Sequence, residues 1–368
     1  MRRIFLFALG AILCLSAKPV PCLWDYDTLA QERSRFPSAL ELVTGKFPRH
    51  SDDYYRWRIE DREARRAAGE SSPELFDDIA VAHDKLREHQ RAIALMKEKE
   101  SLFPGLYETA ANHGTFLIHA GRLEQGADEI RRAITINPDA HFGREIYQEL
   151  LVRYVIERRE AGATSPLYEG TVQPYNGPHE NFWTFLVREL AIKDDGVEPA
   201  AQAAVKGLLG MLRFGYHDSP ILLEALADVL LCDPDHDGKR LACRALLKAG
   251  MEVDDEAAKK LFRKKASIAL STQTVKGKGY SPDNIEVAAV EASFKAELAD
   301  ADAYWNELVA NERAWIAAGD DVDARFHETY YAEAAPEHEG DDDGKLPWMA
   351  FALMGVGIAL VIWGLSRR

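Results

Sequence analysis

The sequence predicts an all-α protein, and three observations support this prediction. Apolar and small residues recur at helical spacing over most of the chain, and no long segment alternates with a period of two as a strand would. The same helix-ending signal recurs after 34 residues, at Pro104 and at Pro138. A final apolar stretch is long enough to cross a membrane. We therefore expect a solenoid of helical hairpins with additional helices and one C-terminal transmembrane helix.

The N-terminus has the residue order of a secretory signal peptide. Arginines at positions 2 and 3 precede an apolar run over residues 4–15, and small residues follow it. We expect a signal peptide over residues 1–22. An uncleaved membrane anchor has the same residue order and stays an alternative.

Residues 23–72 are expected to form an N-terminal helical segment, with breaks at Pro37 and Pro48. From Phe47 to Arg66 the segment interleaves aromatic, arginine and acidic side chains. Partner-binding surfaces are rich in arginine and aromatic residues, but a helix with buried rings and paired charges has the same composition. We favour packing over partner contact here.

Three consecutive repeat units are expected next, two complete and one partial: 73–106, 107–140 and 141–160. Each complete unit is typical of a helix-turn-helix. Small residues occupy equivalent positions in both, since Ala80 corresponds to Gly114 and Ala92 to Gly126. Small side chains allow close helix approach, so stacked hairpins bury a core that a single hairpin cannot.

This period and pattern resemble the tetratricopeptide-repeat family over residues 73–140, with departures at His83 and Lys99. The resemblance implies a concave groove lined by side chains of the first helix of each unit. Those residues are Glu74, Asp77, Asp84, Lys85, Glu108, Asn112, Thr115 and His119. The family implies a protein or peptide ligand, and the acidic character of this set indicates a basic or neutral one.

The following half of the chain is also helical in this prediction. A loop rich in Gly and Pro covers residues 161–180, and a second array of helical hairpins covers 181–275. Within that array Ser219 and Pro220 form the helix-start signal that also precedes the first repeat. One long helix is expected over 281–318.

The C-terminal end is predicted to anchor the chain. An acidic tether over 319–345 leads to an uncharged segment at 346–365, whose 20 residues match a hydrocarbon core of about 30 Å. A buried helix of a soluble protein is the alternative. Two arginines lie in the tail at 366–368, so we expect a single-pass protein with a cytoplasmic C-terminus and an exported bulk, periplasmic or otherwise extracytoplasmic.

The net charge and the motif content of the sequence limit the classes of function that the protein can have. The net charge of -15 argues against nucleic acid as a partner, because binding to phosphates needs a positive surface. No catalytic, cofactor-binding or metal-binding motif is recognised, and the four cysteines lack metal-ligand spacing. Asp233 to Gly238 resemble the opening of a calcium loop, but Arg244 stands where such a loop needs a glutamate, so calcium binding there stays open.

These features favour a membrane-anchored scaffold or adaptor for protein–protein interaction. The alternative is a metal-dependent or acid–base enzyme whose site is assembled from scattered residues such as His113, His141 and Glu145.

Overall fold

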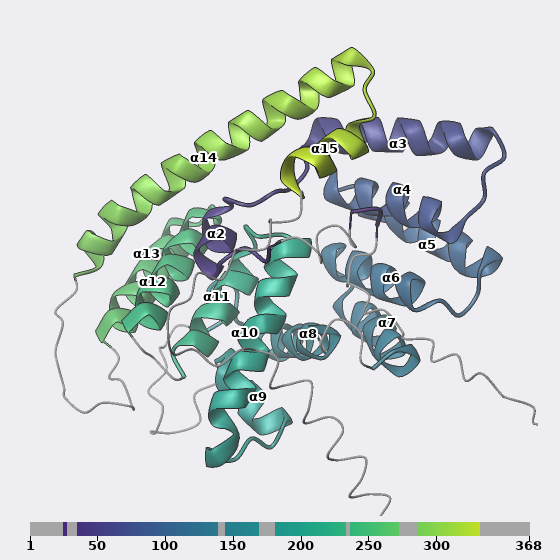
Figure 1. Ribbon diagram of the computed structural model, residues 1–368. Coiled ribbons are helices and arrows are strands. Elements are labelled where there is room, and N and C mark those ends of the chain that lie inside the picture. The colour runs from purple at the N-terminus through teal and green to yellow at the C-terminus, as the bar shows by residue number, and fades with distance from the viewer. Residues whose placement is uncertain are drawn as a thin grey trace, which may run out of the picture. The chain divides into compact units, whose positions relative to one another are not determined.

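The computed structural model describes residues 25–27, 35–138, 144–168, 181–232, 236–271 and 286–331. The chain divides into two compact units, Met1–Ala332 and Glu333–Arg368, and all described residues lie in the first. Every regular element of the described residues is a helix, and none is a strand (Figure 1). The predicted all-α class is therefore confirmed.

Four helices of similar length cover the region of the two complete repeat units: α4 (Pro73–Lys85), α5 (His89–Leu102), α6 (Tyr107–His119) and α7 (Leu123–Ile136). Each packs against the next along the chain (Figure 1). The hydroxyl of Ser72 accepts a hydrogen bond from the backbone N–H of Leu75 and so caps α4. Gly121 joins α6 to α7 with φ of 78°, in the left-handed region that favours glycine.

Glycines allow α6 and α7 to lie very close together. A Cβ atom on Gly126 would lie 2.6 Å from the side chain of Ile118 and 2.9 Å from the carbonyl oxygen of Gly114. A Cβ atom on Gly114 would lie 2.8 Å from the side chain of Ile130. The two helices thus meet in opposite directions at a distance that larger side chains would prevent.

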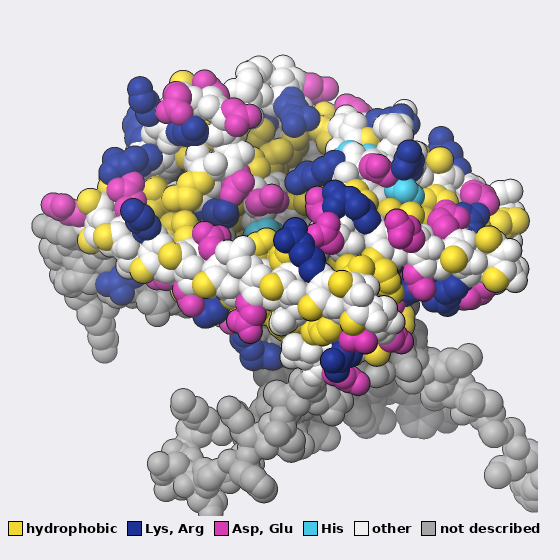
Figure 2. All heavy atoms as spheres, turned by 90° about the horizontal axis from the view of Figure 1, so that it is seen from above, with side chains coloured by type: hydrophobic (Ala, Val, Ile, Leu, Met, Phe, Trp, Pro, Cys, Tyr) yellow, Lys and Arg dark blue, Asp and Glu magenta, His cyan; other side chains and the backbone are white. Residues whose placement is uncertain are grey.

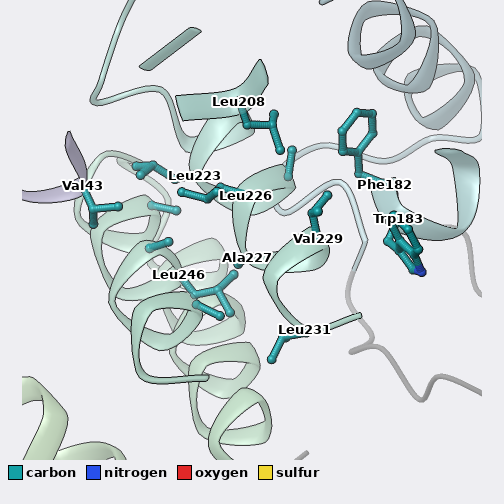
Figure 3. Close-up of a cluster of buried hydrophobic side chains, with 14 of the residues drawn as sticks. Val43, Phe182, Trp183, Leu208, Leu223, Leu226, Ala227, Val229, Leu231 and Leu246 are labelled. Carbon is teal, nitrogen blue, oxygen red and sulfur yellow. The ribbon is translucent and has the colours of Figure 1, made fainter. Parts of the chain in front are cut away.

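The largest hydrophobic core lies among the helices that follow: α8 (Arg144–Glu160), α9 (Phe182–Glu189), the short 3-10 helix η2 (Asp194–Gly196), α10 (Val197–Phe214), α11 (Pro220–Leu230), α12 (His236–Met251) and α13 (Glu256–Ser271). Leu208, Leu226 and Leu246 are among its buried side chains (Figure 3). Val43 from α2 (Ala39–Thr44) belongs to the same core, so an early segment of the chain packs against helices that come much later in the sequence.

The remaining helices are α3 (Asp52–Ala67), α14 (Val287–Ala318) and α15 (Val322–Tyr330). Helix α14 packs against α3 and α15, and Tyr54 and Tyr55 of α3 are buried with Val322. The aromatic residues of α3 therefore serve packing at these positions. Residues 319–331 were expected to belong to an acidic tether, but they contain the packed helix α15.

Several predicted segments lie outside the described residues. These are the signal peptide at 1–22, the tether beyond residue 331, the membrane segment at 346–365 and the tail at 366–368. Among the residues that the structure describes, no helix combines the length and the apolar character that crossing a membrane requires.

Candidate functional site

One carboxylate lies between two histidines where three helices end. Asp84 is in the last turn of α4, His89 is the first residue of α5 and His119 is the last residue of α6. The Nδ1 atom of His89 donates to Oδ1 of Asp84 at 2.7 Å, and the Nδ1 atom of His119 donates to Oδ2 at 2.8 Å. Both carboxylate oxygens are thus held by imidazoles. We call this group the Asp84 cluster.

Burial and charge act in opposite directions on Asp84, whose side chain is fully buried. Burial by itself raises the pKa of this carboxyl, because the charged form is desolvated. The charge of His119 and the hydrogen bonds from His119 and His89 outweigh this effect, and the pKa of Asp84 lies far below its usual range. The carboxylate is therefore ionised at neutral pH.

The turn after α10 is hydrogen-bonded to the end of α4. The Tyr216 hydroxyl donates to the backbone carbonyl of Asp84 at 2.7 Å, and the Lys85 ammonium donates to the carbonyls of Phe214 and Gly215 at 2.8 and 2.6 Å. Arg87 has φ of 64°, a conformation uncommon for a residue with a side chain, and its guanidinium lies 3.9 Å from the Tyr216 ring centroid. These contacts fix the loop that carries His89.

A cavity of about 290 Å³ adjoins the cluster between α6, α8, α10 and α11. His119 and Tyr216 belong both to its lining and to the surroundings of Asp84. Much of the wall is apolar, including Leu151, Val155 and Leu222. The cavity thus offers mainly hydrophobic contact, with polar groups at a few places.

Those polar groups include two arginines of α8. Arg144 is buried, with its guanidinium 4.6 Å from the Phe214 ring centroid, whereas Arg159 is exposed. A Cβ atom on Gly210 would lie 2.7 Å from Cδ of Arg144, so this glycine of α10 leaves the space through which the arginine passes. Both arginines line the cavity.

Gln148 also lines the cavity, and its side chain contains an unsatisfied acceptor. Its Nε2 atom donates to Oγ1 of Thr115 at 3.1 Å, which orients the amide. Its Oε1 atom is buried and has no hydrogen-bond partner in the described part of the chain. A buried polar atom without a partner is costly unless a water or a ligand satisfies it.

The eight residues predicted to line a groove are placed in different surroundings. Thr115 and His119 line the cavity, and Asp84 and Lys85 lie beside it. Glu74 is exposed and Glu108 is half-buried. The other two, Asp77 and Asn112, are buried and bonded to each other at 3.0 Å.

A second buried charged group surrounds Asp27, between α3, α14 and α15. Asp27 accepts hydrogen bonds from His50 at 2.9 Å and from His327 at 2.8 Å, and it also pairs with Arg58. The other ring nitrogen of His50 donates to Glu312 at 2.8 Å. Since Asp27, His50, Arg58 and Glu312 are all buried, this group fastens the early segment onto later helices.

The residues of the alternative enzyme site have other partners. Glu145 accepts a hydrogen bond from the Tyr107 hydroxyl at 2.6 Å, and His113 lies 3.5 Å from Glu129. His141 is outside the described residues. So are Asp233 and Asp235 of the possible calcium loop, while Arg244 pairs with Glu297 at 2.7 Å.

Sequence reasoning missed His89 and the association of the three cluster residues. The available signal was the spacing: His89 follows Asp84 by five residues across one turn, and His119 follows Asp84 by 35, one residue more than the repeat period. In adjacent hairpins such positions fall at neighbouring helix ends. The chain matches no known protein-family model, and no curated protein is significantly similar to it.

Proposed function

We propose that this chain is an exported adaptor protein with tetratricopeptide-type helical repeats, held to a membrane by residues 346–365. In this proposal the cavity between α6, α8, α10 and α11 binds a segment of a partner protein. The observation that carries the proposal is the lining of that cavity, which combines an apolar wall with the exposed Arg159 and the side chain of Gln148. The close packing of α6 and α7 supports the repeat assignment.

The cavity dimensions indicate a small part of a peptide as the occupant. Sites for small ligands usually measure about 300–1,000 Å³, so about 290 Å³ accommodates one or two apolar side chains. Burial of one such side chain against the apolar wall contributes about 1.5–3 kcal/mol. A rotation of the Gln148 side chain would let its carbonyl oxygen accept a backbone N–H of the peptide and so satisfy this buried acceptor.

Arg159 indicates an acidic group on the ligand. The sequence-based expectation of a basic or neutral ligand depended on carboxylates such as Asp77 and Asp84, which are buried and bonded inside the chain to Lys99 and to two histidines. Figure 2 shows acidic and basic side chains intermixed over one face, without a continuous field of either sign. We therefore expect local recognition of a carboxylate by Arg159 next to the apolar side chain.

The test is affinity purification of the full chain from detergent-solubilised membranes, followed by a binding assay with peptides from the protein recovered. We expect Leu222→Arg, which fills the cavity, to abolish recovery, and Arg159→Glu to weaken peptide binding about tenfold or more. Gln148→Met should weaken it to a similar extent, because one hydrogen bond is lost.

Arg91→Glu is the matched control, since Arg91 lies exposed on α5 and does not line the cavity. It makes the same charge change as Arg159→Glu and should leave binding unchanged. Circular dichroism of each variant verifies that the helices are intact. Recovery of the same partner by wild type and by folded Leu222→Arg would contradict the proposal.

A further inference from the structure

We propose that the Asp84 cluster is a binding site for a divalent transition-metal ion, with Zn²⁺ as the best match to its donor atoms. The site would use one carboxylate oxygen of Asp84 and the Nδ1 atoms of His89 and His119. This inference is independent of the peptide-binding proposal, because it depends only on the three side chains and their geometry.

The three side chains that offer ligand atoms lie close together. These atoms all lie within 4.8 Å of one another, and the two Nδ1 atoms approach the two different carboxylate oxygens at 2.7 and 2.8 Å. Zinc ligands lie about 2.0–2.2 Å from the ion, which places donor atoms roughly 3.3–3.5 Å apart in a tetrahedron. Each hydrogen-bonded N–O pair must therefore separate by about half an ångström or more, and a pair near the 4.8 Å limit must approach. Zinc also replaces the Nδ1 protons that the histidines donate to Asp84, so binding releases protons.

The surrounding helices hold the donors in place. Asp84 is fully buried in the last turn of α4, and its backbone carbonyl is bonded to the Tyr216 hydroxyl at 2.7 Å. His89 and His119 are each 18% exposed, so an ion has a path to the site from solvent. His119 also lines the cavity, from which water or a ligand group would supply the fourth ligand.

The donor set selects the class of metal. Calcium requires six to eight oxygen ligands, and magnesium prefers oxygen in octahedral geometry, so two imidazoles and one carboxylate fit neither. Imidazole nitrogen suits zinc and neighbouring transition metals. Two cations lie near the cluster, but the Lys85 ammonium is bonded to the carbonyls of Phe214 and Gly215, and Arg87 is exposed.

The test is isothermal titration of ZnCl₂ into the full chain in detergent, purified without a metal-affinity tag and dialysed against a chelator. We expect one tightly bound zinc per chain in the wild type. Each of Asp84→Asn, His89→Gln and His119→Gln should weaken binding more than about 100-fold, since loss of outer partners alone costs 10–100-fold. Bound Co²⁺ should show a visible absorption spectrum that the same substitutions change.

His83→Gln is the matched control. His83 lies on α4 beside Asp84, and its ring pairs with Glu88, so its loss should leave zinc affinity unchanged. Leu222→Arg should also retain zinc, which separates this site from the peptide site. The proposal is overturned if the wild type binds no zinc, or if folded cluster variants bind it as tightly as the wild type does.

Discussion

The ammonium group of Lys99 lies 2.6 Å from Oδ2 of Asp77, and both side chains are buried between α5 and α4. Lys99 stands where the repeat pattern favours a small residue, and the ion pair accounts for its place in the interior. The amide of Asn112 donates to the other oxygen of Asp77 at 3.0 Å. This group therefore couples the first hairpin to α6.

Removal of Lys99 should be severely destabilising. Burial raises the pKa of Asp77 to about 7 even with Lys99 beside it. Lys99→Met removes that charged partner, and breaking a buried pair costs about 3–5 kcal/mol, of which uptake of a proton by Asp77 offsets a part. The double variant Lys99→Met with Asp77→Leu should recover most of that loss, because no uncompensated charge remains. Urea unfolding at pH 7 measures the free energy of unfolding of the single and of the double variant. Equal stability of the single and double variants would contradict the explanation.

The His50 group predicts a pH dependence of stability. Burial lowers the pKa of His50, but Asp27 and Glu312 raise it more strongly, to about 9 from an ordinary 6.5. The folded state thus binds the proton more tightly than the unfolded state. This contribution to the free energy of unfolding, on the order of 3 kcal/mol, is complete below pH 6.5 and is lost as the pH rises through 9.

His50→Gln provides the comparison for this pH dependence. The difference in the free energy of unfolding between wild type and variant should shrink from pH 6 to pH 9.5. Neighbouring groups do not reverse the trend in this range, since the pKa of Asp27 is lowered and that of Tyr54 is raised well above 10. A difference that stays constant with pH would show that His50 carries no extra proton in the folded state.

The contact between α6 and α7 predicts a penalty at Gly126. In Gly126→Ala the new methyl group meets Ile118 and the Gly114 carbonyl at less than 3 Å, and overpacking of this kind costs about 1–3 kcal/mol. The better helix propensity of alanine offsets about 1 kcal/mol of this penalty. We expect a lower thermal midpoint. In the control Gly196→Ala, the nearest atom to the new Cβ lies at 3.8 Å, and stability should be retained.

The membrane assignment stays a prediction for residues outside the described structure. Deletion of residues 346–368 should move the protein from the carbonate-resistant membrane fraction to the soluble fraction, because the deleted segment holds the 20 uncharged residues. Deletion of the C-terminal tail alone, residues 366–368, is the control and should leave the protein in the membrane. A truncated chain that stays with the membrane although its signal peptide has been removed would refute the predicted C-terminal anchor.

The sequence predicted the helices better than it predicted the site. Helix starts such as Ser72 and spacings such as Gly114 to Gly126 depend on local chemistry, which the sequence displays directly. The expected groove required Asp77 and Asp84 to be exposed. Their burial depends on Lys99, the histidines and the turn at Tyr216, which is 132 residues away from Asp84 in the chain. A repeat pattern carries no information about such distant contacts.

The expected tether over residues 319–345 is a second case in which the sequence did not display the distant contacts that decide the structure. The acidic composition of the expected tether indicated a solvated segment, but the buried side chains of Val322 and Phe326 hold α15 against α3 and α14. Asp323, one of those acids, is paired with Arg62 of α3. Its charge is therefore part of the folded interior.

Site-specific photo-cross-linking in native membranes shows whether the cavity beside His119 receives a partner segment. A photoreactive residue at Ile221, which lines the cavity, should yield one defined protein adduct, and Arg159→Glu should lower its yield. The same probe at Arg91 should yield no such adduct. Absence of an adduct at Ile221, or the same adduct from both positions, would contradict the account.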